Sequence, residues 1–218
     1  MNDPESLLRT VGWLPSSENP WPVPVLDLRS FVSGMLAVSS DQAAATNVAL
    51  LGGDDGVGFV GQAAPIARFT PVRVRYLVDP GSADGVLFSP TAMEHKWAIF
   101  MHDQRLLFVR SWQRRLVATA SMTIRSETLE IDSVEGVFTG PEETPSLTAA
   151  TLDFLIRTHA LGQVHPAPFP SDLSSDPKQV ALWCFGAFGN RALFATPERW
   201  DAPPADQTLR TRTPHRSA

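Results

Sequence analysis

The sequence lacks any long apolar run. No stretch reaches the roughly 18 to 20 apolar residues that a membrane-spanning helix needs. The first residues, Met1-Asn2-Asp3-Pro4-Glu5, are acidic where a secretory signal would be basic and then apolar. We therefore expect a soluble, cytoplasmic protein with no membrane partner.

Cysteine is nearly absent too. Cys184 is the only cysteine among 218 residues and lies in the apolar stretch 180–185, which predicts a buried, inert thiol in a reducing compartment. A triad of Cys184 with His159 and Asp153 can be drawn, but no nucleophile motif surrounds the cysteine and no G-x-S-x-G segment offers a serine. The sequence thus predicts no nucleophilic active site.

Positive charge is scarce as well. The formal net charge is -5, and Lys96 and Lys178 are the only lysines, so arginine supplies the other basic side chains. This balance argues against a protein whose main role is to neutralise the phosphates of nucleic acid.

Phosphate-binding glycine motifs are also missing. Residues 52–61 contain five glycines and two aspartates, but neither G-x-G-x-x-G before a helix nor G-x-x-x-x-G-K-[ST] occurs. The segment is typical of a solvated surface loop, and we predict no cofactor.

The composition is that of a folded protein with many irregular connections. Apolar residues make up 43% of the chain and charged residues 19%, with 19 prolines. The length suits one domain, here residues 1–200, opening with a proline-rich irregular strap over residues 1–24. The aperiodic segment 201–218 is predicted to be disordered.

Alternation with period two predicts a β-meander in the middle of the chain. A first strand over 72–78 is followed by four sequential strands separated by short turns, over 96–101, 106–112, 115–124 and 128–134. Residues 96–101 are apolar on both faces, which indicates a strand that is covered on both sides or held at a partner surface.

Apolar spacing and end signals predict helices on either side of this meander. The segments are 4–11, 42–51, 146–161 and 178–185, the third with Leu152, Leu155, Ile156 and His159 on one buried stripe. The fold class is therefore α+β: an antiparallel meander of about four to six strands packed against two or three helices.

Polar side chains at the two ends of segment 96–101 suggest metal chemistry. Glu94, His95 and Lys96 precede the strand and His102 and Asp103 follow it, roughly 20 Å away at about 3.3 Å per residue, so they cannot share one ion. No metal site is predicted. Glu94-His95-Lys96 is formally the E-x-K of a metal-dependent nuclease, with Asp79 as the second carboxylate, provided that a cleft brings Asp79, Glu94 and Lys96 within about 5 Å.

Arginine and tryptophan are interleaved along the meander. We predict a binding surface there, formed by Trp97, Arg110, Trp112, Arg114 and Arg115. Such a surface suits a protein partner, or single-stranded nucleic acid held by phosphate contacts and base stacking. The opposing interpretation is that the aromatic side chains are core and the arginines are merely solvated.

Three functions follow. The leading hypothesis is a non-catalytic cytoplasmic protein-binding domain of inhibitor, antidote or adaptor type, since no catalytic or cofactor motif is present. The alternatives are a metal-dependent hydrolase or nuclease using Asp79, Glu94 and Lys96, and single-stranded nucleic-acid binding by the meander face, which the net charge disfavours.

Overall fold

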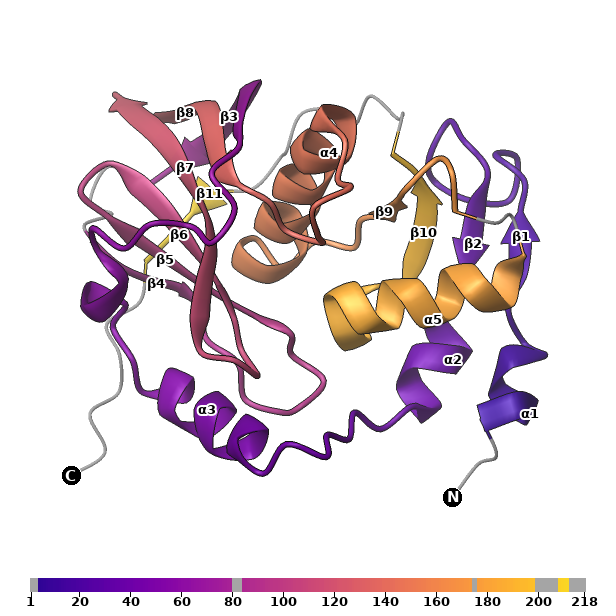
Figure 1. Ribbon diagram of the computed structural model, residues 1–218. Helices are drawn as coiled ribbons and strands as arrows, with labels where there is room; N and C mark the ends of the chain where they lie inside the picture. The colour runs from indigo at the N-terminus through magenta and orange to yellow at the C-terminus, as the bar shows by residue number, and fades with distance from the viewer. Residues whose placement is uncertain (1–3, 80–83, 174–175, 199–207, 212–218) are drawn as a thin grey trace.

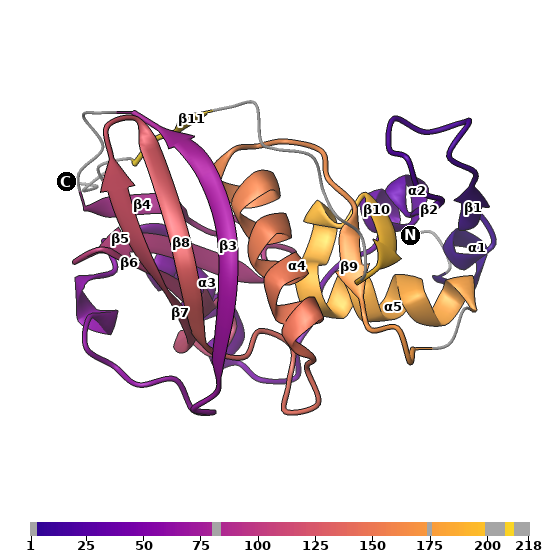
Figure 2. The same cartoon turned by 90° about the horizontal axis from the view of Figure 1, so that it is seen from above.

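The computed structural model describes residues 4–79, 84–173, 176–198 and 208–211. Within these ranges the strands form two sheets, and helix α4 (Pro145–Leu155) lies between them (Figure 1 and Figure 2). The larger sheet has the spatial order β11 (Thr208–Leu209), β3 (Phe69–Val78), β8 (Thr128–Gly136), β7 (Arg115–Arg125), β6 (Arg105–Arg110), β5 (Trp97–His102) and β4 (Gly85–Phe88). The smaller sheet has the order β1 (Gly12–Leu14), β2 (Val25–Asp27), β10 (Phe194–Pro197) and β9 (Ala167–Phe169).

Antiparallel pairing runs from β3 through β8, β7, β6 and β5 to β4, and this confirms the α+β class and the antiparallel meander. Tight reversals join its strands. Asp103 and Gln104 both have positive φ, at 49° and 59°, in the turn from β5 to β6, which is the backbone geometry that matches the twist of a two-residue hairpin. Arg114 and Ser126 have positive φ in the next two turns.

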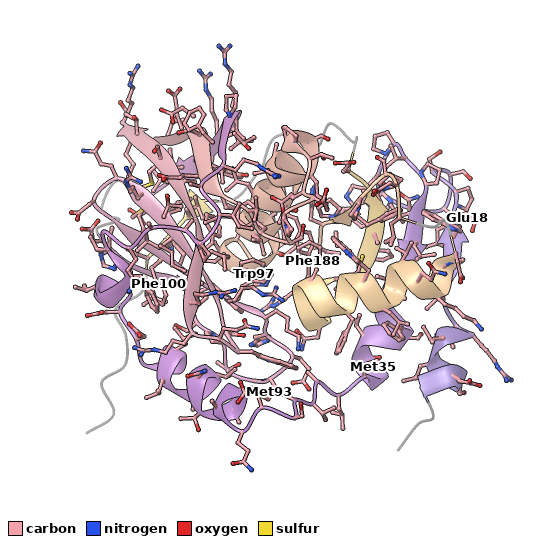
Figure 3. All side chains as sticks on the ribbon, viewed as in Figure 1. Glu18, Met35, Met93, Trp97, Phe100 and Phe188 are labelled. Carbon is pink, nitrogen blue, oxygen red and sulfur yellow. The ribbon has the colours of Figure 1, made fainter. Side chains whose placement is uncertain are left out.

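Strand β5 is buried on both faces, as its sequence predicts. Trp97, Ile99 and Met101 belong to the main core on the side of α4 and α5 (Pro177–Phe188). Ala98 and Phe100 belong to a second cluster. Figure 3 shows Trp97 toward α5 and Phe100 on the other side of the sheet.

Two short elements from the first third of the chain cover that second face. Leu51 of α3 (Ala43–Gly52) and Phe59 of the 3-10 turn η1 (Val57–Phe59) pack there with the sheet. Phe59 stacks on Phe100 with ring centroids 5.9 Å apart. The glycine-rich segment is thus packed against the sheet through η1.

Helix α4 is capped by Thr144, whose side chain accepts from the Leu147 N–H at 3.0 Å. The sequence predicts one helix to about residue 161, but α4 ends at Leu155 and continues as a π-helical turn, η2 (Ile156–Ala160). There the Leu161 N–H donates to the Ile156 carbonyl, five residues back, at 2.9 Å. The predicted stripe, including His159, is buried.

The N-terminal segment contains more regular structure than the predicted strap. Helix α1 (Pro4–Leu8) lies within the predicted helix 4–11, and β1, which was not predicted, pairs with β2 in antiparallel register. Helix α2 (Arg29–Gly34) follows directly. The proline-rich residues 15–24 connect two paired strands, so this segment is part of the smaller sheet's architecture.

The predicted tail, residues 201–218, lies outside the described residues except for 208–211. Within that short range, β11 pairs in parallel with β3, and the Asp79 N–H donates to the Leu209 carbonyl at 3.1 Å. Among the helices of the described chain, none has both the length and the apolar character needed to cross a bilayer.

Candidate functional site

Two adjoining pockets lie beside the C-terminal end of α5, and together we call them the α5 groove. The wide pocket has a volume of about 520 Å³ and lies between α5, the β6–β7 hairpin and residues 137–141. The Lys96 pocket, of about 290 Å³, lies between α5, the same hairpin and residues 36–38. Arg110, Gln113 and Gly186 line both pockets, so the two lie side by side.

The charged side chains that line the α5 groove are all basic. Arg110 and Arg115 line the wide pocket, and Lys96 and Arg110 line the Lys96 pocket. No described residue lining either pocket is an aspartate or glutamate. A protein with net charge -5 therefore presents a locally basic depression, which attracts anionic groups.

Arg110 is fixed at the floor of the groove. Its Nη1 donates to the Ala187 carbonyl at 2.6 Å and its Nη2 to the Gly186 carbonyl at 3.2 Å. A cation at these last carbonyls of α5 complements the helix dipole. Burial lowers the pKa of Arg110 to about 10, so the guanidinium remains charged at neutral pH. Its central carbon lies 4.7 Å from the Trp97 ring centroid.

Lys96 is buried in the wall of its pocket. Its Nζ lies 3.5 Å from the ring centroid of Trp112 and 5.6 Å from that of Phe185. The same Nζ donates to the Met93 carbonyl at 3.2 Å. Burial, and secondly the charge of Arg110, lower the pKa of Lys96 to about 8, against a smaller opposing effect of Glu94.

The wall around Lys96 is held by further backbone contacts. The Trp112 indole N–H donates to the Met93 carbonyl at 2.8 Å, so this carbonyl fixes both the amine and the ring beside it. Glu94 accepts from the Ala37 N–H at 3.0 Å and thereby ties the outer rim of the pocket, residues 36–38, to the start of β5. The site is therefore preformed.

A glycine brings α5 and the start of β5 together. Gly189, which follows α5 in the turn η3 (Gly189–Arg191), has φ +68°. A Cβ atom there would lie 1.7 Å from the Glu94 carbonyl oxygen. Only glycine allows this approach, and it places the end of α5 against the segment that carries Lys96.

The structure brings together three of the five predicted binding residues. Arg110, Trp112 and Arg115 all line the α5 groove. Trp97 is fully buried in the main core instead, and its indole N–H donates to the Ala187 carbonyl at 2.9 Å. Arg114 turns toward the second face, where it pairs with Asp54 at 2.7 Å. Phe108 of β6 is buried as completely as Trp97.

The residues of the predicted hydrolase site do not lie together. Asp79 follows β3, next to Arg210 at 3.4 Å. Glu94 and Lys96 precede β5, and β8, β7 and β6 lie between β3 and β5. Four strand spacings of about 4.8 Å make roughly 19 Å, well beyond the required cleft. In the described part of the chain no three histidine, cysteine, aspartate or glutamate side chains are grouped so as to hold a metal.

The apolar side chains that border the groove were not predicted from the sequence. Leu182 and Trp183 of α5 line the wide pocket, and Leu36 and Val38 line the Lys96 pocket. The exposed position of Leu182 could have been predicted from the sequence. The buried stripe of α5 contains Val180, Ala181, Cys184, Phe185 and Phe188, and Leu182 is an apolar residue off that stripe.

A second polar cluster lies on α4, away from the groove. The Asp153 carboxylate accepts from the Tyr76 hydroxyl at 2.6 Å and from Arg157 Nε at 2.7 Å, and His165 Nε2 lies 3.4 Å from it. Burial, followed by the charge of Arg157, lowers the pKa of His165 to about 3. The cluster joins α4, β3 and the loop after η2 and needs no ligand to explain it.

No known protein family, curated protein or solved structure matches this chain at a significant level. The function is therefore inferred from the α5 groove itself.

Proposed function

We propose that the protein is a non-catalytic binding domain, of inhibitor, antidote or adaptor type, that holds a segment of a partner protein in the α5 groove. The proposal is supported by the residues that line the groove. They are basic and apolar, and no carboxylate is found among the described lining residues. Such a groove suits a segment that carries both acidic and apolar side chains.

Exposed apolar residues at the rim support a macromolecular partner. Leu182 is 50% exposed, Leu36 66% and Val38 82%. Covering such exposed apolar side chains with a partner favours binding by about 25 cal/mol for each Å² of apolar surface buried. Arg115, at the first position of β7, is exposed and is the side chain that can engage an acidic partner residue without rearrangement.

The proposal includes a cytoplasmic location. The one cysteine is fully buried, and burial raises its thiol pKa well above the usual value. A chain that relies on packing, without a disulfide, is suited to a reducing compartment.

A charge-reversal pair on one strand tests the proposal. Arg115 and Arg125 are the first and last residues of β7, both exposed, but only Arg115 lines the groove. Tagged wild type, Arg115→Glu and Arg125→Glu are incubated with native lysate, with and without nuclease, and captured proteins are quantified by mass spectrometry. We expect a stoichiometric protein partner in both arms for wild type and Arg125→Glu, and an affinity for Arg115→Glu at least about tenfold weaker, equivalent to 1.4 kcal/mol.

Two outcomes would contradict this function. One is the absence of any stoichiometric protein partner for the wild type. The other is equal weakening by Arg115→Glu and Arg125→Glu, which would mean that only overall charge matters. Capture of nucleic acid that disappears with nuclease would favour the single-strand alternative instead. Titration of the purified pair at rising salt then measures the share of binding that depends on exposed charge.

A further inference from the structure

The two lysines of this chain occupy opposite environments. Lys178 is exposed near the start of α5, whereas only 6% of Lys96 is exposed and its amine faces a pocket. In the described structure the contacts of the Lys96 amine are two aromatic rings and one backbone carbonyl. Lysine side chains more often extend their amine into water.

We infer that Lys96 is a reactive amine that condenses with a small carbonyl compound bearing a carboxylate, a 2-oxo acid, in the pocket it shares with Arg110, Trp112 and Phe185. This inference does not rest on partner binding in the α5 groove, and either one can hold without the other.

The surroundings of Lys96 suit nucleophilic chemistry. A lysine becomes a nucleophile at neutral pH when it is desolvated or lies beside another cation, and here both conditions occur, because Arg110 lines the same pocket. With a pKa of about 8, on the order of 10% of the amine is unprotonated at pH 7, a share about 300-fold larger than for an ordinary lysine.

Pocket size and charge define the substrate class. A volume of about 290 Å³ lies at the lower end of the range of small-molecule sites, so the pocket admits a small compound and excludes a bulky one. Arg110 is the cation available to a carboxylate, since its guanidinium has five N–H donors and its bonds to α5 use two of them. The rings of Trp112 and Phe185 provide apolar walls for the rest of the molecule.

The step is balanced without oxidant or reductant. The lone pair of Nζ attacks the carbonyl carbon to give a carbinolamine, and the carbonyl oxygen leaves as water with both hydrogens of the neutral amine. A carbon–nitrogen double bond replaces the carbon–oxygen double bond. Protonation of the imine restores the positive charge that the protonated lysine carries.

Reductive trapping of the full-length protein tests the inference, with pyruvate as the probe. The folded protein is incubated with pyruvate and cyanoborohydride at pH 7, and peptide mapping gives the initial labelling rates of Lys96 and Lys178. We expect Lys96 to be labelled more than about tenfold faster, less than the 300-fold ratio of unprotonated amine because access to the pocket is restricted. In protein unfolded by urea the two rates should become equal.

Acetone serves as the neutral comparison probe, with each rate divided by that of Lys178 in the same sample. The preference for Lys96 should be several-fold larger with pyruvate, because only pyruvate offers a carboxylate to Arg110. Lys96→Arg, which keeps the charge and most of the size, should abolish the fast-labelled site and leave Lys178 unchanged. Equal labelling of Lys96 and Lys178 in the folded protein would overturn the inference, and an equal preference with acetone would overturn the assignment of a carboxylate-bearing substrate.

Discussion

Trp97 and Arg110 donate to the same atom, the carbonyl oxygen of Ala187, at 2.9 and 2.6 Å. They are also direct partners across β5 and β6, so one cross-strand pair fastens the larger sheet to the end of α5. This junction forms the floor of the α5 groove. The two residues thus hold the floor of the groove in place, Trp97 from inside the core and Arg110 from the pocket surface.

Replacing Arg110 with methionine should destabilise the fold. Arg110→Met removes two hydrogen bonds to the last carbonyls of α5, and we expect the free energy of unfolding to fall by about 1–3 kcal/mol. Urea denaturation measures the change. Arg125→Met, an exposed position on β7, is the control and should change stability by less than about 0.5 kcal/mol. A similar loss in both variants would show that the bonds to α5 contribute little.

Trp97 should matter for stability and not for direct partner contact. Trp97→Phe keeps an aromatic ring in the core but removes the indole N–H that bonds Ala187, so we expect a loss of about 1–3 kcal/mol. Partner affinity, measured well below the unfolding temperature, should stay within about twofold of wild type. Strong loss of affinity from a fully folded Trp97→Phe protein would restore the interpretation of Trp97 as a contact residue.

Two glycines with the same φ differ in how closely they are packed. Gly189 and Gly162 both have φ +68°, but a Cβ at Gly189 would meet the Glu94 carbonyl oxygen at 1.7 Å, whereas one at Gly162 meets nothing within 4 Å. Gly162→Ala should cost about 1 kcal/mol, the strain of a left-handed backbone. Gly189→Ala should cost at least about 2 kcal/mol more, because η3 must shift away from the start of β5 and because φ +68° with ψ −146° lies outside the left-handed helical region. Equal costs from chemical denaturation would argue against the tight approach.

Acid should destabilise the protein through its buried histidines. Burial holds the pKa of His165 at about 3, against about 6.5 in the unfolded chain. The folded state keeps this ring neutral while the unfolded state takes up a proton, so its contribution to stability is complete above pH 6.5 and is lost progressively as the pH falls toward 3. Between pH 7.5 and pH 5 the loss is about 2 kcal/mol for one such group.

His165→Gln removes that titration. The difference in unfolding free energy between pH 7.5 and pH 5 should therefore shrink by about 2 kcal/mol in the variant. The contrary outcome is that acid raises the unfolding free energy of the wild type and that His165→Gln abolishes this increase. It would mean that the ion pair with Asp153 outweighs burial. His159, whose pKa burial lowers well below the usual value, should act in the same direction and leave a residual acid sensitivity in the variant.

Local patterns predicted most of the strands and helices because each depends on residues close in sequence. Alternation identified β3, β7 and β8, and the apolar run 96–101 identified β5. Asp176 with Pro177 identified the start of α5, where the Asp176 side chain accepts from the Lys178 N–H. The pattern failed where a β-bulge intervenes. The sequence places Leu116 and Ala118 on one face, but the register shifts between Phe108 and Val109 of β6, and Leu116 packs in the second cluster instead.

The candidate site was only partly predictable because its parts come from distant segments. Arg110, Trp112 and Arg115 were found through the arginine and tryptophan interleaved on neighbouring strands. Leu36, from the segment after α2, and Phe185, from α5, line the same pocket. No local sequence pattern indicates that α5 ends against β5. Lys96 was identified for a different chemistry, since its enclosure by two rings depends on that same long-range packing.

The pairing of β2 with β10 sets the order in which the chain can complete its fold. Asp27 lies opposite Phe194 in the smaller sheet, and the main core extends from Leu7 to Leu209. During synthesis β2 therefore cannot pair with β10 until nearly the whole sequence has been translated. Contacts of such large sequence separation make folding slow, and nascent or truncated chains that end before β10 should expose the apolar face of β2 to chaperones or to aggregation.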